Sequence, residues 1–262
     1  MKVALTIAGS DSSGGAGIQA DIKTFQAHGV YAMSAVTAVT VQNTRKVYDI
    51  AEMRPEIVSG QIQCLFDDIT IHAVKIGMVS GIELIEAIAE TLSRQTLPPV
   101  VLDPVMISKS GYALLKKDAR NALIKRLFPL AQVLTPNIHE AAALINRDID
   151  TVEGMKTAAK EILDMGVKNV VVKGGHMAGD LAVDILYDGS SFEELSARRF
   201  ETKNTHGTGC TFSSAIAANL ALGKSFFESV ALAKTYITGA IEHSLDIGKG
   251  HGPTNHFWML IK

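Results

Sequence analysis

Cysteine and tryptophan are scarce in this chain, which has two cysteines and one tryptophan among its 262 residues. The cysteines, Cys64 and Cys210, lie far apart in unlike surroundings. Small disulfide-stapled proteins have many paired cysteines, so a disulfide framework is not expected here. A reducing compartment follows as the simplest interpretation, and we predict a cytoplasmic location.

A dominant charge and long hydrophobic runs are also absent. The 25 Lys and Arg residues nearly balance the 27 Asp and Glu residues, for a formal net charge of −2. Without basic clusters or tails, neither nucleic acid nor an anionic membrane is an expected partner. The longest apolar stretch, residues 31–41, contains Ser and Thr and is too short to span a bilayer. Residues 2–9 already resemble a strand, so we expect no cleaved leader.

The chain does contain 47% hydrophobic residues, arranged as β-branched apolar runs that alternate with amphipathic segments. The runs predict strands at 2–9, 31–42, 73–79, 99–105, 132–137 and 169–175, and a hairpin over 181–201 that turns at Asp188 and Gly189. Helical spacing predicts helices at 17–29, 55–69, 80–95, 118–130, 151–166, 210–222 and 225–244.

The strands before the hairpin are continuously apolar, which is typical of strands buried on both faces. We therefore predict an α/β fold in which helices flank both faces of a mostly parallel sheet. No linker or repeat interrupts the pattern, so residues 1–262 are expected to form one domain. Ligands bind beyond the carboxyl ends of strands in such folds. Polar residues and glycines gather at those ends, as in GSDSSGGAG, QNTR, GMVSG, DPV, TPNIHE, KGGH and NTHGTGC.

Two familiar nucleotide-binding loops do not fit this chain. Residues 15–20 match a dinucleotide-binding glycine pattern, but the second strand ends in Gln42 and Asn43 without the acid that holds a ribose. The Gly-Lys-Ser sequence at residues 223–225 follows a helix and has Ala218 in place of the leading glycine of a P-loop. If the protein binds phosphate, it must use another structural feature.

The sequence HGTGC at residues 206–210 predicts such a feature. The start of a helix offers unpaired N–H groups and partial positive charge, so it can hold an anion without lysine. Gly207 and Gly209 allow the backbone to curl so that several amides converge. The same field is expected to lower the pKa of Cys210 and give its thiol partial thiolate character. The alternative is a small buried cysteine that serves only packing.

Taken together, these motifs resemble the ribokinase superfamily, and in particular its vitamin-kinase branch. The chain is most similar to the hydroxymethylpyrimidine/phosphomethylpyrimidine kinases of thiamine biosynthesis, and the resemblance covers essentially its full length. It rests on TIAGSDSSGGAGIQAD, VTVQNT, KIGM, VLDPVM, LTPNIHEA, VVVKGGH and NTHGTGCTFSSAIAA. The resemblance implies a ribokinase-like fold, ATP as phosphoryl donor, Mg²⁺, and a homodimer.

The resemblance also implies roles for the phosphate-facing residues. Gly207, Thr208 and Gly209 would form the anion hole, and Cys210 would accept or relay the proton of the substrate hydroxymethyl group. Lys173 would neutralise phosphate charge on the ATP side. The remaining phosphate-side roles fall to Asn137 and Lys234 for the nucleotide and to Asp103 and Glu140 for magnesium. Elementary chemistry agrees, because phosphoryl transfer needs mainly positioning and charge neutralisation, and Mg²⁺ prefers one or two carboxylates plus waters and phosphate oxygens.

Substrate selection is expected in the first half of the chain. An aminopyrimidine presents a ring nitrogen acceptor beside an amine donor, and the amide of Gln42 can pair with both at once. Met78 and Val105 are candidates to sandwich the ring, although ordinary core packing is the better explanation for either residue taken alone. Gly9 and Ala16 would keep large side chains out of the first loop, so that the ring can lie against the backbone. Asp21 is placed near this site, as is His206, whose role is left open.

These features predict phosphorylation of 4-amino-5-hydroxymethyl-2-methylpyrimidine and of its monophosphate, a small-molecule reaction. Pyridoxal or pyridoxine phosphorylation is the nearest alternative, since it uses the same reaction on a different ring. Gln42 favours the pyrimidine. A nicotinamide-dependent oxidoreductase lacks its ribose-binding acid. A catalytically silent binding protein is disfavoured by the complete set of acids, glycines and cysteine.

Overall fold

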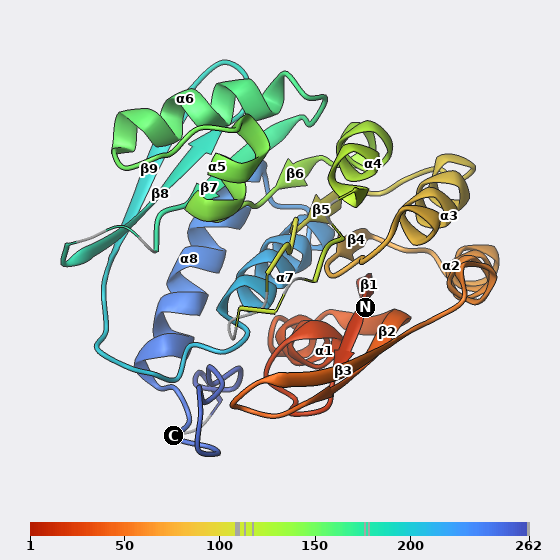
Figure 1. Ribbon diagram of the computed structural model, residues 1–262, viewed down its shortest axis with the longest axis horizontal. Coiled ribbons are helices and arrows are strands. Elements are labelled where there is room, and N and C mark those ends of the chain that lie inside the picture. Colours follow the sequence, from red (N-terminus) through yellow and green to blue (C-terminus); the bar gives the residue numbers. More distant parts are fainter. Residues whose placement is uncertain (108–110, 113, 117, 176, 178, 261–262) are drawn as a thin grey trace.

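The computed structural model describes residues 1–107, 111–112, 114–116, 118–175, 177 and 179–260. Within these residues, nine strands form one sheet in the order β3-β2-β1-β4-β5-β6-β7-β8-β9 (Figure 1). The strands are β1 (Val3–Asp11), β2 (Tyr31–Gln42), β3 (Val47–Glu52), β4 (Ala73–Ile76), β5 (Val100–Leu102), β6 (Val133–Leu134), β7 (Asn169–Lys173), β8 (Leu181–Tyr187) and β9 (Phe192–Arg198). From β2 to β7 all neighbours pair in parallel, whereas β3, β8 and β9 are antiparallel additions at the two edges.

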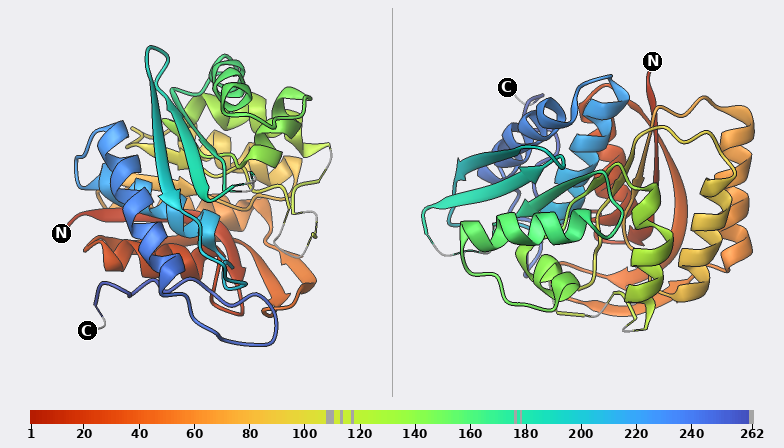
Figure 2. Two further views of the ribbon diagram at one scale, coloured as in Figure 1. Left: turned by 90° about the vertical axis from the view of Figure 1, so that its left-hand side faces the viewer. Right: turned by 90° about the horizontal axis from the view of Figure 1, so that it is seen from above.

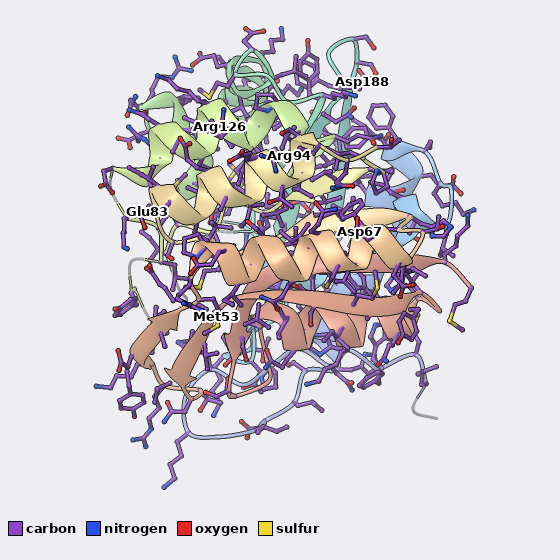
Figure 3. All side chains as sticks on the ribbon, turned by 90° about the vertical axis from the view of Figure 1, so that its right-hand side faces the viewer. Met53, Asp67, Glu83, Arg94, Arg126 and Asp188 are labelled. Carbon is purple, nitrogen blue, oxygen red and sulfur yellow. The ribbon has the colours of Figure 1, made fainter. Side chains whose placement is uncertain are left out.

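Helices cover both faces of this sheet, as predicted (Figure 2). One face carries α2 (Pro55–Asp68), α3 (Ile82–Ser93), α4 (Ala119–Arg126), α5 (Ile138–Ile145) and α6 (Val152–Leu163). Figure 3 shows α2, α3 and α4 side by side on this face, with charged side chains such as Asp67 and Arg94 at the surface. The other face carries α1 (Gly17–Ala27), α7 (Thr208–Ala221) and α8 (Phe226–Glu242). The mostly parallel α/β architecture predicted from the sequence is therefore confirmed.

Helix α7 is the most deeply buried helix on the second face. Its residues from Thr211 to Ala221 are all buried, and most of them are small. Small side chains let the helix lie close to the sheet, to α1 and to α8, because little volume separates the backbones. This packing brings the start of α7 to the carboxyl ends of the central strands.

The sequence-based prediction missed two elements and lengthened others. Strand β3 was not predicted, because it is a mostly exposed edge strand that contains charged residues. Helix α5 was also not predicted, since its eight residues follow directly on a short strand. Predicted helix 118–130 is α4 followed by a 3₁₀ turn at Phe128–Leu130. The hairpin is confirmed, with Tyr187 opposite Phe192 and Asp188 accepting backbone bonds from Ser190 and Ser191.

The order of the strands in the sheet predicts where a ligand would bind. Strand β1 lies between β2 and β4, so the chain leaves β1 in one direction along the sheet and later continues from its other side. Such a switch point opens a crevice at the carboxyl ends of the strands. The pairing of β1 with β2 is irregular between Ala8 and Ser10, around Gly9. No helix within the described part of the chain is long and apolar enough to cross a bilayer.

Candidate active site

A cavity of about 800 Å³ lies at the carboxyl ends of the central strands. It is lined from the ends of β1, β2, β4, β5 and β7, from the start of α7, and from β8, β9 and α8. Every site residue predicted from the sequence except Asp21 lines this cavity: Gly9, Ala16, Gln42, Met78, Val105, Asp103, Asn137, Glu140, Lys173, Gly207, Thr208, Gly209, Cys210 and Lys234.

The loop before α7 needs glycine for two different reasons. Gly207 is the N-cap of α7 and has φ +79°, in the left-handed region that favours glycine. A Cβ at Gly207 would also overlap the carbonyl oxygen of Gly15, so the two glycine loops touch. Gly209 has no such backbone constraint. A Cβ there would lie 3.4 Å from Lys173 Nζ and 3.5 Å from Asp103 Oδ2, so Gly209 keeps space open beside a charged pair.

Only part of this loop offers free amides. Thr208 donates its N–H and its hydroxyl to the Thr205 carbonyl, at 3.3 and 2.8 Å, so its amide is engaged. Thr211 N–H bonds the Gly207 carbonyl at 2.8 Å. Within the described residues, the N–H groups of Gly209 and Cys210 have no hydrogen-bond partner. These two amides at the helix start can bind an anion.

Cys210 lines the cavity and is partly exposed, but its acidity is the reverse of the prediction. Burial raises the pKa of the Cys210 thiol to about 11, although the ammonium of Lys75 opposes the rise and the Gly17 N–H bonds the sulfur. The field of the helix start is outweighed because taking a thiolate out of water is costly. The predicted thiolate character is therefore wrong for the ligand-free protein.

Lys75 and Asp21 form an ion pair that lies completely inside the protein. Lys75 Nζ is 3.0 and 2.9 Å from the two oxygens of Asp21, which also accepts bonds from Thr6 and Ser214. Burial alone would lower the pKa of Lys75, but the Asp21 carboxylate outweighs it and raises that pKa. Asp21 is thus fully buried against Lys75 and does not line the cavity itself, although it was placed near the substrate site.

Lys75 was missed by the sequence analysis, although it lines the cavity. The signal was present in the stretch KIGM, since a lysine inside an apolar buried strand is rare unless it is paired. Its partner could not be found from the sequence, because Asp21 lies 54 residues away.

Asp103 and Lys173 form a second ion pair, on the far side of Gly209. Lys173 Nζ lies 2.9 Å from Asp103 Oδ1, which also accepts a bond from Thr135 at 3.0 Å. Burial would lower the pKa of Lys173, but Asp103 and Glu140 outweigh this and raise it. The lysine therefore stays charged and can neutralise an anion in the cavity.

Glu140 and Asn137 form a capping box at the start of α5. The Asn137 side chain accepts the N–H of His139 and of Glu140, at 2.9 and 3.0 Å, while Glu140 Oε2 accepts the Asn137 N–H at 2.8 Å. Burial raises the pKa of Glu140 to about 7, and Lys173 opposes this. The cap orients both residues and leaves Glu140 Oε1, 3.5 Å from the Met106 N–H, as its less engaged oxygen.

The two carboxylates fit a magnesium ion only as a partial ligand set. Among the described residues, no cluster of three or more His, Cys, Asp or Glu side chains could hold a metal. Mg²⁺ keeps most of its waters and takes few protein ligands when phosphates supply the rest. A buried carboxyl such as Glu140, whose pKa is raised, would gain from a nearby cation. Asp103 and Glu140 therefore suit a magnesium ion that arrives with phosphate.

Lys234 lines the other end of the cavity, on α8. Its ammonium donates to Asp184 Oδ2 at 2.7 Å and to the Ala182 carbonyl at 2.9 Å. The Asp184 carboxylate already balances the charge of Lys234. To contact a nucleotide, Lys234 would have to exchange Asp184 for a phosphate or use the methylene groups of its side chain. The nucleotide contact stays a prediction.

The predicted ring-binding residues line the cavity from the ends of β1, β2, β4 and β5. A Cβ at Gly9 would lie 3.1 Å from Met78 Sδ, so Gly9 makes room for the methionine. Ala16, Val105 and Gln42 line the same cavity. The Gln42 side-chain amide lies 3.3 Å from His206 Nε2 and 3.3 Å from Thr40 Oγ1.

Asp11 is a second residue that the sequence analysis missed. Its carboxylate accepts backbone bonds from Ser13, Gly15 and Ala16, and it lies 2.7 Å from His206 Nε2. Burial would raise the pKa of Asp11, but the bonds from His206 and Ser13 outweigh it and lower that pKa to about 2. The signal was an aspartate that opens a glycine loop, where such side chains often bond the backbone.

Comparisons with known proteins show the family of the chain. The family model for phosphomethylpyrimidine kinase matches residues 11–255. A hydroxymethylpyrimidine/phosphomethylpyrimidine kinase from Rhizobium meliloti is 52% identical over 258 residues, 97% of each chain. Among solved structures, Bacillus subtilis pyridoxal kinase with ADP is 41% identical, with a TM-score of 0.93 and full coverage of both chains. Phosphomethylpyrimidine kinase from Clostridium difficile is 50% identical, with a TM-score of 0.82, covering 92% of this chain and 100% of its own. On its sequence, its fold and the cavity at its strand ends, the chain belongs to the phosphomethylpyrimidine kinase family.

Proposed function

We propose that this protein transfers the γ-phosphoryl group of ATP to the hydroxymethyl group of 4-amino-5-hydroxymethyl-2-methylpyrimidine, and then to the monophosphate, in thiamine biosynthesis. The observation that carries the proposal is the match of nearly the whole chain to kinases of this name, combined with a cavity that is lined by the expected residues. The amides of Gly209 and Cys210 face the same cavity as the Lys173–Asp103 pair.

The phosphate side of the reaction needs positioning and charge neutralisation. We assign the anion hole to the Gly209 and Cys210 N–H groups, with Gly207 and Thr208 shaping the loop. Lys173 supplies a fixed positive charge beside it. Asp103 and Glu140 would hold magnesium, which would neutralise phosphate charge when it is bound with ATP. Asn137 orients Glu140 through the capping box.

The proton of the attacking hydroxyl is assigned to Cys210. With a pKa near 11, the thiol is protonated at neutral pH, so it must first lose its own proton to solvent before the resulting thiolate can accept the hydroxyl proton. Phosphoryl transfer passes through a loose transition state in which the hydroxyl proton is lost late, so the small thiolate fraction is enough to take up that proton and return it to solvent. Lys75 is the cation that would stabilise a transient thiolate, because its charge is the largest influence that lowers the thiol pKa.

Substrate recognition is assigned to Gln42, Met78, Val105, Gly9 and Ala16. The apolar side chains suit a flat ring, and the amide of Gln42 suits its polar edge. Pyridoxal phosphorylation is the second candidate, because solved pyridoxal kinases of Bacillus subtilis and Staphylococcus aureus share this fold at 41% and 36% identity. Gln42 favours the pyrimidine, since its paired donor and acceptor match an aminopyrimidine edge.

A side-by-side assay tests the proposal. Phosphate transfer from ATP would be measured for the hydroxymethylpyrimidine, its monophosphate and pyridoxal, with Mg²⁺ and with Mg²⁺ removed by a chelator. We expect the highest kcat/KM for the pyrimidines and loss of transfer without Mg²⁺. Preference for pyridoxal would support the second candidate, and transfer to neither ring would contradict the proposal.

We also propose a homodimer in the cytoplasm. The dimer is supported by the resemblance and by exposed apolar side chains on the β2–β3 extension, where Val39, Val41 and Tyr48 are each more than 40% exposed. Exposed apolar groups close together favour association. Light scattering after gel filtration tests the dimer, and a monomeric mass at micromolar concentration would contradict it.

A further inference from the structure

The His206 ring is held so that one nitrogen must act as a donor. His206 Nε2 lies 2.7 Å from Asp11 Oδ2, and this carboxylate also accepts the N–H groups of Gly15 and Ala16. An ionised carboxylate can only accept hydrogen bonds. Nε2 therefore carries a proton whether the imidazole is neutral or charged. The ring packs directly on Gly15, where a Cβ would overlap its Cδ2.

The neighbouring amide must match this donor. Gln42 Nε2 lies 3.3 Å from His206 Nε2, whose one proton points to Asp11 at 2.7 Å. This nitrogen has no lone pair for an amide N–H, and it can only share its proton, as a longer second branch of the bond to Asp11, with an amide oxygen. On the other side, Gln42 Oε1 lies 3.3 Å from Thr40 Oγ1. Thr40 spends its only hydroxyl proton on the Ser10 carbonyl, at 2.9 Å, so it has a lone pair to offer but no further proton. A 180° rotation of the amide group corrects both contacts without changing its shape.

We infer that Asp11, His206, Thr40 and Ser10 together fix the orientation of the Gln42 amide, with its oxygen toward His206 and its nitrogen toward Thr40. His206 is then a positioning residue for substrate specificity. The inference rests on the proposed function, since it explains how Gln42 selects a ring. It also gives His206, which directly precedes Gly207, a place between the ring site and the phosphate loop.

A fixed amide has a defined polarity. With its nitrogen bonded to Thr40 and its oxygen on the shared proton of His206, Gln42 has one N–H and one oxygen lone pair left, in a fixed order along its edge. This order suits a ring nitrogen acceptor beside an amine donor. The 4-hydroxy analogue of the substrate carries, as its oxo tautomer, a ring N–H beside an oxygen, which reverses the order. A freely rotating glutamine would bind both rings, whereas a fixed one must reject the analogue.

The experiment compares the two rings in three proteins. For the wild type we expect kcat/KM for the aminopyrimidine to exceed that for its 4-hydroxy analogue by about 100-fold or more, because an unmatched buried polar pair is heavily penalised. His206→Leu removes the donor and Thr40→Val removes the acceptor. Each should lower this ratio by about tenfold or more, mainly through KM, because the amide is then free to rotate.

A matched control and a second readout complete the test. Thr91→Val removes a similar hydroxyl bond, to Ala87 in α3, and should leave the ratio unchanged. If His206→Leu fails to fold, the conservative Thr40→Val still decides. An unchanged ratio in the folded variants would overturn the inference.

In the wild type, ¹⁵N NMR should show a protonated His206 Nε2, and an unprotonated Nε2 would overturn the inference as well. This readout needs no turnover, so it separates the inference from a failure of the proposed function, in which neither pyrimidine is phosphorylated.

Discussion

The Cys210 thiol stands between two opposing electrostatic influences. Burial raises its pKa to about 11, while Lys75 opposes the rise. The start of α7 alone would make the thiol more acidic, as the sequence analysis expected. Desolvation is the larger influence in the ligand-free protein, because the thiolate loses most of its hydration. Lys75 lies at 0% exposure and is already paired with Asp21, so it compensates only in part.

Replacing the thiol tests its role. We expect Cys210→Ala to lower kcat by about 100-fold and to leave the KM for the pyrimidine nearly unchanged, because general acid–base groups contribute about this much. If the thiolate carries the proton, wild-type kcat should keep rising with pH above 9, toward the thiol pKa near 11. Steady-state kinetics across pH measure both effects. Cys64→Ala, on the exposed side of α2, is the control, and wild-type turnover in Cys210→Ala would remove the thiol from the mechanism.

Glu140 makes the free energy of unfolding depend on pH. Burial raises its folded-state pKa from 4.5 to about 7, so the folded protein binds this proton more tightly than the unfolded chain. Stability is therefore lost as pH rises from 4.5 to about 7, and the full cost remains above that.

Removing this charge should stabilise the ligand-free protein at high pH. Glu140→Gln keeps an acceptor for the capping box, because Gln also serves at this position. We expect the variant to be more stable than the wild type by about 3 kcal/mol at pH 8 and by less than about 1 kcal/mol at pH 5. Urea unfolding at the two pH values measures the difference. Equal stability differences at both pH values would show that the pKa of Glu140 is not raised in the folded protein. The variant should also need more Mg²⁺ for activity.

At the scale of elements, both ends of α7 depend on a left-handed glycine. Gly207 caps the start with φ +79°, and Gly223 follows the end with φ +88°. Their surroundings differ. A Cβ at Gly207 would overlap the Gly15 carbonyl, whereas a Cβ at Gly223 would meet nothing within 4 Å. Comparing substitutions at Gly207 and Gly223 therefore separates the cost of backbone strain from the cost of steric overlap.

Alanine at each position tests this distinction. Gly223→Ala should cost about 1 kcal/mol, which is the penalty of a left-handed alanine. Gly207→Ala should cost about 2 to 4 kcal/mol, because overlap with the Gly15 backbone is added, and it should abolish phosphate transfer. Thermal unfolding and kinase assays measure both. Equal stability losses would mean that the Gly15 loop yields freely.

The elements themselves were predictable to different degrees. Long periodic helices such as α3 and α6 follow directly from the spacing of their apolar residues. Strand β3 was not predictable in this way, because it is exposed on most of its length and owes its place to pairing with β2. Helix α5 is eight residues long, and its start depends on the Asn137–Glu140 cap.

For the whole molecule, we propose a single domain. The sheet is continuous from β3 to β9, and each face is filled by one core cluster of buried residues. The last described segment packs against α8 and contains Trp258. The Trp258 indole donates to the Tyr236 carbonyl at 3.1 Å and stacks on His243.

The single tryptophan provides the test. If residues 1–262 form one cooperative domain, the fluorescence of Trp258, which reports the C-terminal segment and α8, should unfold at the same denaturant concentration as the far-UV circular dichroism of the whole chain. Trp258→Phe, followed by circular dichroism alone, controls for the contribution of the indole to stability. Two separate transitions would contradict the single domain.

The amino-acid sequence by itself determined the features that depend on neighbouring residues. These are the alternation of buried strands with amphipathic helices, the glycines that turn the loops, and the polar residues that follow each strand. A parallel sheet then brings these residues to one edge, which is why nearly all of the predicted site lines one cavity.

Only the tertiary structure decided the features that depend on distant partners and on burial. Asp21 pairs with Lys75 inside the protein, Asp11 holds His206 beside Gln42, and the thiol of Cys210 becomes a weaker acid instead of a stronger one. Such pairings join residues from about 50 to nearly 200 positions apart. The pKa of a group depends on how much water the complete fold removes from around it, and no local pattern of residues records that quantity.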